Sequence, residues 1–360
     1  MLIHPDKGNA FLKIVFDWQI SSFFGWGIYG LNLALELANV SGVEARTSMP
    51  SDPRGISVDP LRAQVLYPIL ERSSKGPPSP DSVWLHALGN DFLEERPPQA
   101  RVGVIFFEAP LSAAALERAK EYDVIVTGSS WNEGVLKSAG LANVRTILQG
   151  VDRSIFCPAP KRNVFPGRFL VFSGGKAERR KGQDIVVAAF RIFARRHSDA
   201  MLVTAWHSPW PQLARGLDLD LSEFAGRVID VGTLPNIVMA SVYRECDVAL
   251  FPNRAEGGTN LVAMECLACG VTTILSDNTG HRDLLRMGLG EPLAQVTSNV
   301  WSEWGETEIE AAVDALERAY AAPRRVATAP EMPTWSDAAN SLVAVATDSL
   351  SRPNLAPTHR

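Results

Sequence analysis

The feature that most constrains the fold is a regular alternation of short apolar runs with helix-length segments along most of the chain. The apolar runs are rich in Val, Ile and Phe and lack a polar face. Strands of this kind are buried on both sides, which predicts parallel sheets covered by helices. The predicted strands are residues 11–16, 83–87, 102–107, 123–128, 144–148, 168–174, 200–206, 227–232, 247–252 and 271–277. The predicted helices are residues 28–38, 112–121, 131–138, 181–196, 237–245 and 261–268.

A proline-rich joint, Cys157-Pro158-Ala159-Pro160, separates two such alternating runs. A chain of 360 residues is long enough for about two domains. The prediction is therefore an α/β protein with two doubly wound, Rossmann-like domains. Their expected bounds are residues 1–158 and 159–333, followed by a helix at 334–350 and a tail at 351–360.

Composition excludes several classes of protein. With 46% hydrophobic residues the chain is neither disordered nor collagen-like, and a net charge of −5 argues against nucleic acid as the main partner. No apolar run approaches the ~20 residues of a membrane-spanning helix, and charged residues interrupt the N-terminal segment where a signal peptide would be apolar. The four cysteines form no framework, and the lone pair Cys266 and Cys269 predicts buried core thiols. A reducing, cytoplasmic location is expected.

The first glycine motif, Gly25–Gly30, reads G-x-G-x-x-G between a predicted strand and a predicted helix. Glycines there let backbone amides approach a phosphate, as in dinucleotide-binding folds. A tight strand-to-helix turn needs the same glycines. A dinucleotide site also needs an acidic residue at the end of the strand that follows this helix, and Glu44 is not a convincing candidate because it precedes the core of that strand. Nicotinamide binding therefore rests on this motif alone.

The second glycine region, Gly174–Gly182, also follows a strand and leads into a helix. Lys176, Arg180 and Lys181 gather positive charge beside a helix N-terminus, a combination that suits a diphosphate. The alternative is a solvated basic turn. The expectation is a local cationic cluster of a size to match one diphosphate.

A third loop, ending at Gly257–Asn260, precedes the predicted helix 261–268. Thr259 or Asn260 can cap that helix. Glu256 in the loop could accept a hydrogen bond from a sugar hydroxyl, and Glu265 in the helix could accept two from a ribose diol. The alternative is an ordinary capped helix with one exposed glutamate.

Together these loops resemble the retaining GT-B glycosyltransferases, known as glycosyl transferases group 1 or glycosyltransferase family 4-like proteins. The family signature G-R-L-x-x-x-K-G is matched from Gly175 to Gly182, with lysine in the arginine position. The family signature E-x7-E is matched by Glu256 and Glu265, with eight residues between them instead of seven. The joint Gly150–Pro158 resembles the family's G-V-D-x-x-x-F-x-P, and Pro333–Ser336 resembles the start of its final helix.

The resemblance implies a GT-B fold, with a cleft between an acceptor-side first domain and a donor-side second domain, and a final helix that crosses back to the first domain. It implies sugar transfer from a nucleotide-diphosphate sugar to an acceptor hydroxyl, with retention and without a metal or other cofactor. Where the family often carries a histidine, the chain reads Phe106-Phe107-Glu108, so Glu108 is expected at the sugar, with His86 as the alternative. The expected catalytic residues are Lys176, Lys181, Glu256 and Glu108. The expected donor-binding residues are Gly25, Gly27, Gly175, Arg180, Gly257, Gly258, Thr259, Asn260, Leu261 and Glu265.

The substrates stay open at this point. The acceptor is a carbohydrate, a lipid-linked sugar or a small molecule, in polysaccharide, glycolipid or glycoconjugate synthesis, and peripheral contact with the inner face of the membrane is compatible with each. The nucleotide base, the sugar and the oligomeric state are undetermined. The alternative functions are a GT-B nucleotide-sugar epimerase, a nicotinamide oxidoreductase and a non-catalytic sugar-binding protein.

Overall fold

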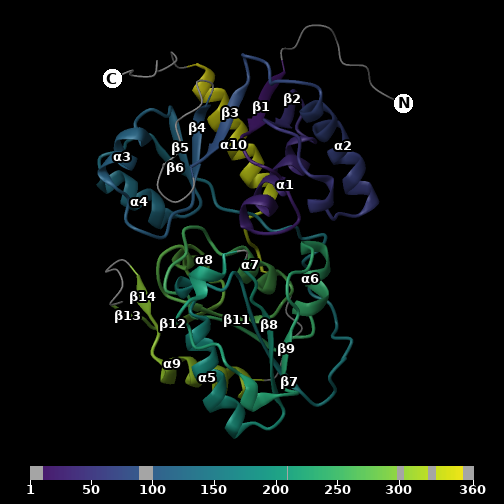
Figure 1. The fold of residues 1–360 in the computed structure, drawn as a ribbon, viewed down its shortest axis with the longest axis vertical. Helices are drawn as coiled ribbons and strands as arrows, with labels where there is room; N and C mark the ends of the chain where they lie inside the picture. The colour runs from purple at the N-terminus through teal and green to yellow at the C-terminus, as the bar shows by residue number, and fades with distance from the viewer. Residues whose placement is uncertain (1–10, 89–99, 209, 298–303, 323–329, 352–360) are drawn as a thin grey trace.

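The computed structural model describes residues 11–88, 100–208, 210–297, 304–322 and 330–351 and contains two parallel sheets, one in each half of the molecule (Figure 1). In the upper half, six strands pair in the order β2-β1-β3-β4-β5-β6, all parallel. These strands are β1 Leu12–Phe16, β2 Val43–Thr47, β3 Val83–Ala87, β4 Ala100–Ile105, β5 Val124–Thr127 and β6 Val144–Thr146. The helices of this half are α1 Gly25–Leu37, α2 Pro60–Ser74, α3 Ala113–Ala119 and α4 Ser130–Ser138.

The lower half repeats the plan with the strand order β12-β11-β10-β7-β8-β9. Its strands are β7 Phe169–Gly174, β8 Ala200–Ala205, β9 Val228–Asp230, β10 Val248–Phe251, β11 Thr272–Ser276 and β12 Glu291–Leu293. Its helices are α5 Gln183–Arg196, α6 Asn236–Tyr243, α7 Leu261–Ala268, α8 His281–Arg286 and α9 Ile309–Ala321. A short antiparallel pair, β13 Val296–Thr297 with β14 Gly305–Glu306, lies at one side. The expected pair of doubly wound α/β domains is confirmed.

The last helix, α10 Trp335–Leu350, packs in the first domain although it follows the second in sequence (Figure 1). A capping box between Thr334 and Asp337 starts it. Trp335 and Leu342 are buried in the core under the first sheet. A Cβ on Gly150 would lie 2.1 Å from the backbone nitrogen of Trp335, so only glycine lets the joint pass this close to the helix start. The expected crossover helix is confirmed.

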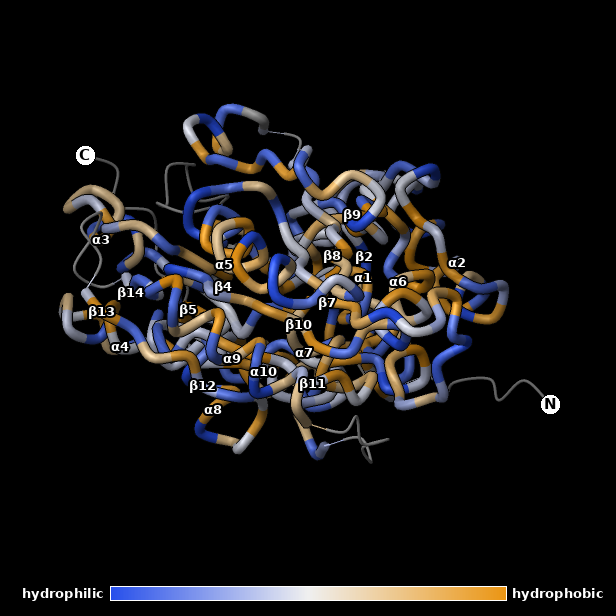
Figure 2. The backbone as a smooth tube through the Cα atoms, turned by 90° about the horizontal axis from the view of Figure 1, so that it is seen from below, coloured by the Kyte–Doolittle hydropathy of each residue, from blue (hydrophilic) through white to orange (hydrophobic). Residues whose placement is uncertain are grey.

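Sequence patterning missed some elements and recovered others. Helix α2 was not predicted, because Pro68 lies inside it and its apolar face is narrow. Helix α7, in contrast, has the predicted bounds, since Asn260 caps its start and an apolar run fills it. Figure 2 shows hydrophobic stretches running through the interior at β10 and α7. Cys266 and Cys269 are buried free thiols in this core, as predicted. Among the described helices, none has both the length and the apolar character needed to cross a bilayer.

Candidate functional site

The two domains contact each other through loops at the carboxyl ends of their strands. After β5, the Ser129 hydroxyl donates to the Gly257 carbonyl at 2.7 Å, across the interface. The backbone N–H of Ser130 donates to the Asp283 carboxylate, also at 2.7 Å. Because ligands of doubly wound sheets bind beyond the carboxyl ends of the strands, this interface is where a binding site is expected.

The loop after β7 carries the basic residues, and two glycines shape it. Gly175 has φ +118° and Gly182 has φ +70°, both in the left-handed region. A Cβ on Gly182 would lie 2.3 Å from the carbonyl oxygen of Pro252, the residue that follows β10. Glycine at 182 therefore lets the short 3-10 helix Arg179–Lys181 pack directly against the loop after β10.

That packing brings four of the expected residues together in one buried cluster. The Lys181 Nζ lies 2.5 Å from Glu256 Oε1, and Arg180 Nη1 lies 3.2 Å from Glu256 Oε2. Arg180 also lies 3.5 Å from the Glu108 carboxylate, which reaches it from the first domain. Lys176, at the edge of the cluster, pairs with Glu178 at 3.1 Å.

The cluster fixes the charge state of its members. Burial by itself would raise the pKa of Glu256, but Lys181 and Arg180 lower it to about 2. Burial lowers the pKa of Lys181, and the attraction of Glu256 opposes that shift. Burial also raises the pKa of Glu108, against the pull of Arg180. Glu256 is therefore an ionised carboxylate at neutral pH.

The expected cations gather in one place, but each of them is paired with an acid that the sequence did not reveal. Three cations, Lys176, Arg180 and Lys181, contact three carboxylates. The carboxylates are Glu108, Glu178 and Glu256. An unbalanced buried charge is costly, so the fold supplies each cation with an acid. A diphosphate arriving here would compete with carboxylates for cations that are already positioned.

The loop before α7 is held between the two domains. A Cβ on Gly257 would lie 2.8 Å from the Phe107 carbonyl, and a Cβ on Gly258 would lie 2.7 Å from Gln149 Oε1. Asn260 adopts φ +65°, which is uncommon outside glycine, and its side-chain oxygen accepts from the Ala263 N–H at 3.4 Å. Thr259 is fully buried, with its hydroxyl 3.0 Å from the Met264 sulfur, and Leu261 begins the helix.

Glu265 lies one turn into α7 and points toward α6. Its Oε1 accepts from the Asn236 amide at 2.6 Å and its Oε2 from the Tyr243 hydroxyl at 2.8 Å. Burial raises its pKa to about 7, although both hydrogen bonds favour the ionised form. The structure thus shows Glu265 with neutral partners on both oxygens, and its ribose role stays a prediction.

The glycines of the first motif lie at the start of α1, and their donor-binding role stays a prediction. A Cβ on Gly27 would lie 1.9 Å from the Ser21 hydroxyl, whereas one on Gly25 would meet nothing within 4 Å. The same loop does reach the second domain, because the Asn236 N–H donates to the Ser22 carbonyl at 3.3 Å. His86 is buried and 2.7 Å from the Tyr122 hydroxyl.

A turn after β11 completes the site, and sequence analysis missed it. The backbone N–H of Glu256 donates to the Thr279 hydroxyl at 2.8 Å, and the Gly280 N–H donates to the Glu256 carbonyl at 3.0 Å. A Cβ on Gly280 would lie 1.8 Å from the Gly258 carbonyl. His281 follows and contacts Asn260. The available signal was a Thr-Gly-His sequence that begins two residues after the end of a predicted strand.

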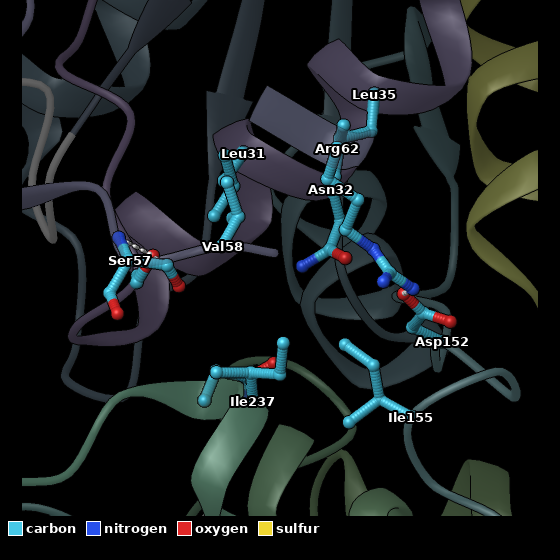
Figure 3. A pocket seen from close by; sticks show the side chains of 11 residues that line it. Leu31, Asn32, Leu35, Ser57, Val58, Arg62, Asp152, Ile155 and Ile237 are labelled. Carbon is cyan, nitrogen blue, oxygen red and sulfur yellow. Dashed lines mark hydrogen bonds and ion pairs between the residues drawn. The ribbon is translucent and has the colours of Figure 1, made fainter. Parts of the chain in front are cut away.

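A small pocket opens beside the joint, between α1, the start of α2 and α6 (Figure 3). Arg62 crosses it to Asp152, with 2.6 Å between Nη2 and Oδ2, and Leu31 and Ile237 supply apolar walls. This pocket was not predicted. In the part of the chain that the structure describes, no group of three or more His, Cys, Asp or Glu side chains is arranged to hold a metal.

Comparison with known proteins identifies the class. Two facing six-stranded parallel sheets with a helix that crosses back form the GT-B fold, and the match to sucrose-phosphate synthase of Thermosynechococcus elongatus has a TM-score of 0.65. That match covers 94% of this chain and 98% of the synthase, at 17% identity. Residues 167–319 match the family Glycosyl transferases group 1. The similarity to this family thus lies in the second half of the chain, which holds the second sheet.

The two curated relatives described here each match less than half of this chain. Phosphatidyl-myo-inositol mannosyltransferase of Mycobacterium tuberculosis is 31% identical over 147 residues, which is 39% of this chain and 37% of the mannosyltransferase. O-antigen biosynthesis protein RfbC of Myxococcus xanthus is 31% identical over 172 residues, which is 46% of this chain and 13% of RfbC. The matched stretches thus span well under half the length of these relatives.

Proposed function

We propose that the protein is a glycosyltransferase that moves a sugar from a nucleotide-diphosphate sugar to an acceptor hydroxyl, with retention at the anomeric carbon. One observation carries the proposal. Arg180 and Lys181 converge with Glu256, just ahead of the start of α7, at the carboxyl ends of the second sheet. Fixed cations, free amides and a helix N-terminus together suit a diphosphate leaving group.

In this proposal the donor lies on the second domain. Lys176, Arg180 and Lys181 stabilise the charge that develops on the departing diphosphate, in exchange for their present carboxylate partners. Glu265 accepts from the ribose hydroxyls. Glu256 and the backbone of Gly257–Asn260 position the transferred sugar.

The first domain supplies the other wall. Glu108 contacts a sugar hydroxyl, and its contact with Arg180 at 3.5 Å opens when the donor enters. The bond between the anomeric carbon and the phosphate oxygen breaks while the acceptor oxygen bonds to the same face of that carbon. The departing phosphate oxygen takes the acceptor proton, so no side chain has to act as general base. Closure of the domains excludes water.

The relatives suggest the acceptor class. Their names refer to phosphatidyl-myo-inositol and to O-antigen biosynthesis. We therefore propose a lipid-linked or polysaccharide-precursor acceptor in bacterial glycolipid or glycoconjugate synthesis. The proposed location is the cytoplasm, with peripheral contact at the membrane when the acceptor is lipid-linked. None of the similarities reported above supports an epimerase, an oxidoreductase or a sugar-binding protein without activity.

A thermal-shift panel tests the proposal. GDP, UDP, ADP and CMP, and the corresponding nucleotide sugars, are added one at a time, and one nucleotide family is expected to stabilise the protein by a few kcal/mol well above its Kd. Nuclear magnetic resonance of the transferred sugar's anomeric proton then reports retention. Absence of any stabilisation, or an isomerised nucleotide sugar formed without acceptor, would contradict the proposal.

A further inference from the structure

The turn after β11 contains a histidine whose two ring nitrogens both have partners. His281 is fully buried, with Nδ1 2.9 Å from the Ser276 hydroxyl and Nε2 3.0 Å from the Asn260 side-chain nitrogen. Ser276 ends β11, Asn260 precedes α7, and His281 begins α8. One ring therefore links three elements around the proposed donor loop.

The hydrogen bonds define which nitrogen carries the proton. The Ser276 hydroxyl donates its only hydrogen to the Asn253 carbonyl, 2.6 Å away, so toward His281 it can only accept. Nδ1 of His281 must therefore be protonated. In a neutral ring Nε2 is then an acceptor, and it takes a hydrogen from the Asn260 amide nitrogen.

This arrangement fixes the Asn260 side chain in one orientation. With its nitrogen turned to His281, its oxygen faces the Ala263 N–H and caps α7. The backbone of Asn260 is in the left-handed region, at φ +65°, a conformation that persists only where its surroundings hold it. The chain of hydrogen bonds from the Asn253 carbonyl through Ser276 and His281 stabilises Asn260 in this conformation.

We propose that neutral His281, protonated on Nδ1, is a positioning residue that sets Asn260 and the start of α7 for donor binding. The inference rests on the proposed function, because the nucleotide-diphosphate donor is the ligand that would report it. His281 acts through Asn260 and does not itself contact the donor.

The charged groups around the ring are consistent with a neutral state. Glu256 faces it from the loop after β10, and Lys181 and Arg180 face it from the loop after β7. Asp283, two residues along α8, turns instead to Ser130 of the first domain. Burial, the largest influence, lowers the pKa of His281 to about 4 even though Glu256 opposes that shift. Protonation would place a hydrogen on Nε2, which would then face the N–H group of the Asn260 side chain. The hydrogen bond between His281 and Asn260 is therefore lost as the pH falls through about 4.

The first experiment reads the ring directly, without any ligand. Long-range proton–nitrogen correlation spectra distinguish the two tautomers, and with six histidines in the chain, His281→Phe assigns the signal. The expected result is a neutral Nδ1–H tautomer at pH 7. Asn260→Asp, which places an acceptor opposite Nε2, should raise the pKa of His281 by at least about one unit. An Nε2–H tautomer, or an unchanged pKa in Asn260→Asp, would overturn the proposal.

The second experiment measures donor binding by calorimetry, using the nucleoside diphosphate that the thermal-shift panel selects. His281→Phe keeps the ring volume but removes both hydrogen bonds, and should raise the Kd about 10- to 100-fold. The matched control is His197→Phe at the end of α5, where the ring pairs with Glu317. That control should stay within about twofold of the wild type.

The outcomes separate the two proposals. If the wild type binds a nucleoside diphosphate and His281→Phe binds it as tightly as His197→Phe does, the positioning role is overturned while the proposed function stands. If the wild type binds none of the four nucleotides, the proposed function fails, and the donor-positioning role fails with it.

Discussion

Glu256, in the loop before α7, and Glu265, within α7, are almost equally buried, but their pKa values are shifted in opposite directions. The two residues are 4% and 5% exposed, yet the pKa of Glu256 is lowered to about 2 and that of Glu265 is raised to about 7. Burial raises both pKa values. The difference comes from the partners, because Glu256 contacts two cations whereas Glu265 accepts from an amide and a hydroxyl.

The comparison shows that burial alone does not set the charge state of a site carboxylate. Glu256 belongs to a network that includes Arg180 and Lys181 and joins Glu108 of the first domain, so its charge is part of how the domains meet. Glu265 lies inside the second domain, against Tyr243, and no cation among the described residues fixes its charge. Its protonation state can therefore change with pH or when a ligand binds. If this difference governs the site, variants of the two glutamates should differ in stability and in donor binding.

The largest expected effect is on stability. Glu256→Gln leaves Lys181 and Arg180 buried without their shared carboxylate, and should lower the free energy of unfolding by about 3–5 kcal/mol. Glu265→Gln is the matched control, since it removes a carboxylate of equal burial whose partners are neutral, and should cost about 1 kcal/mol or less. Urea unfolding of the two variants at pH 7 makes the measurement. Equal losses would show that the cation network does not distinguish the two sites.

The next effect is on transfer. Lys181→Ala removes a cation that we assign to the leaving diphosphate, and should lower kcat/KM for transfer about 100-fold or more. Lys137→Ala is the control, because that lysine pairs with Glu133 on α4 and lies partly exposed. Steady-state kinetics with the donor selected by the thermal-shift panel provides the readout. Near-normal turnover in Lys181→Ala would contradict the diphosphate assignment.

Local patterns in the sequence predicted the elements that carry the site. Helix α7 could be placed correctly because Asn260, an apolar run and Gly270 mark its start, interior and end. The basic loop after β7 could be placed because its glycines and cations are contiguous. Both are properties of short segments, which sequence patterns report well.

The pairing within the site could not be predicted in the same way. The contacts of Arg180 with Glu108 and Glu256 join residues 72 and 76 positions apart, and only the packing of three loops brings them together. The same holds for the contact between His281 and Asn260, which are 21 positions apart and meet only through the packing of their loops. Charge balance in a site is a tertiary property, so a run of basic residues in sequence does not reveal the acids that will face it.

The pH dependence of stability should differ between the two glutamates. Glu265 has a raised pKa, so the folded protein binds more protons than the unfolded chain, and its contribution is lost as pH rises toward 7. Glu256 has a lowered pKa, so its contribution is present above the ordinary glutamate range and is lost as pH falls toward 2. Between pH 5 and pH 7, Glu265 should lower the free energy of unfolding by about 1–2 kcal/mol. Unfolding curves of the wild type and Glu265→Gln across this range check the slope, which should be flatter in the variant.

The smallest effect is on donor affinity. Glu265→Ala removes both acceptor oxygens assigned to the ribose and leaves Asn236 and Tyr243 without a partner. Because ribose contacts are made in the ground state as well as in the transition state, the change should raise the donor KM about three- to tenfold with little effect on kcat. Tyr243→Phe is the control that separates ribose binding from loop support, since it removes one hydrogen bond to Glu265 and keeps the carboxylate. A KM that rises in Tyr243→Phe as much as in Glu265→Ala would assign the effect to α6–α7 packing, and an unchanged KM in Glu265→Ala would remove the ribose role altogether.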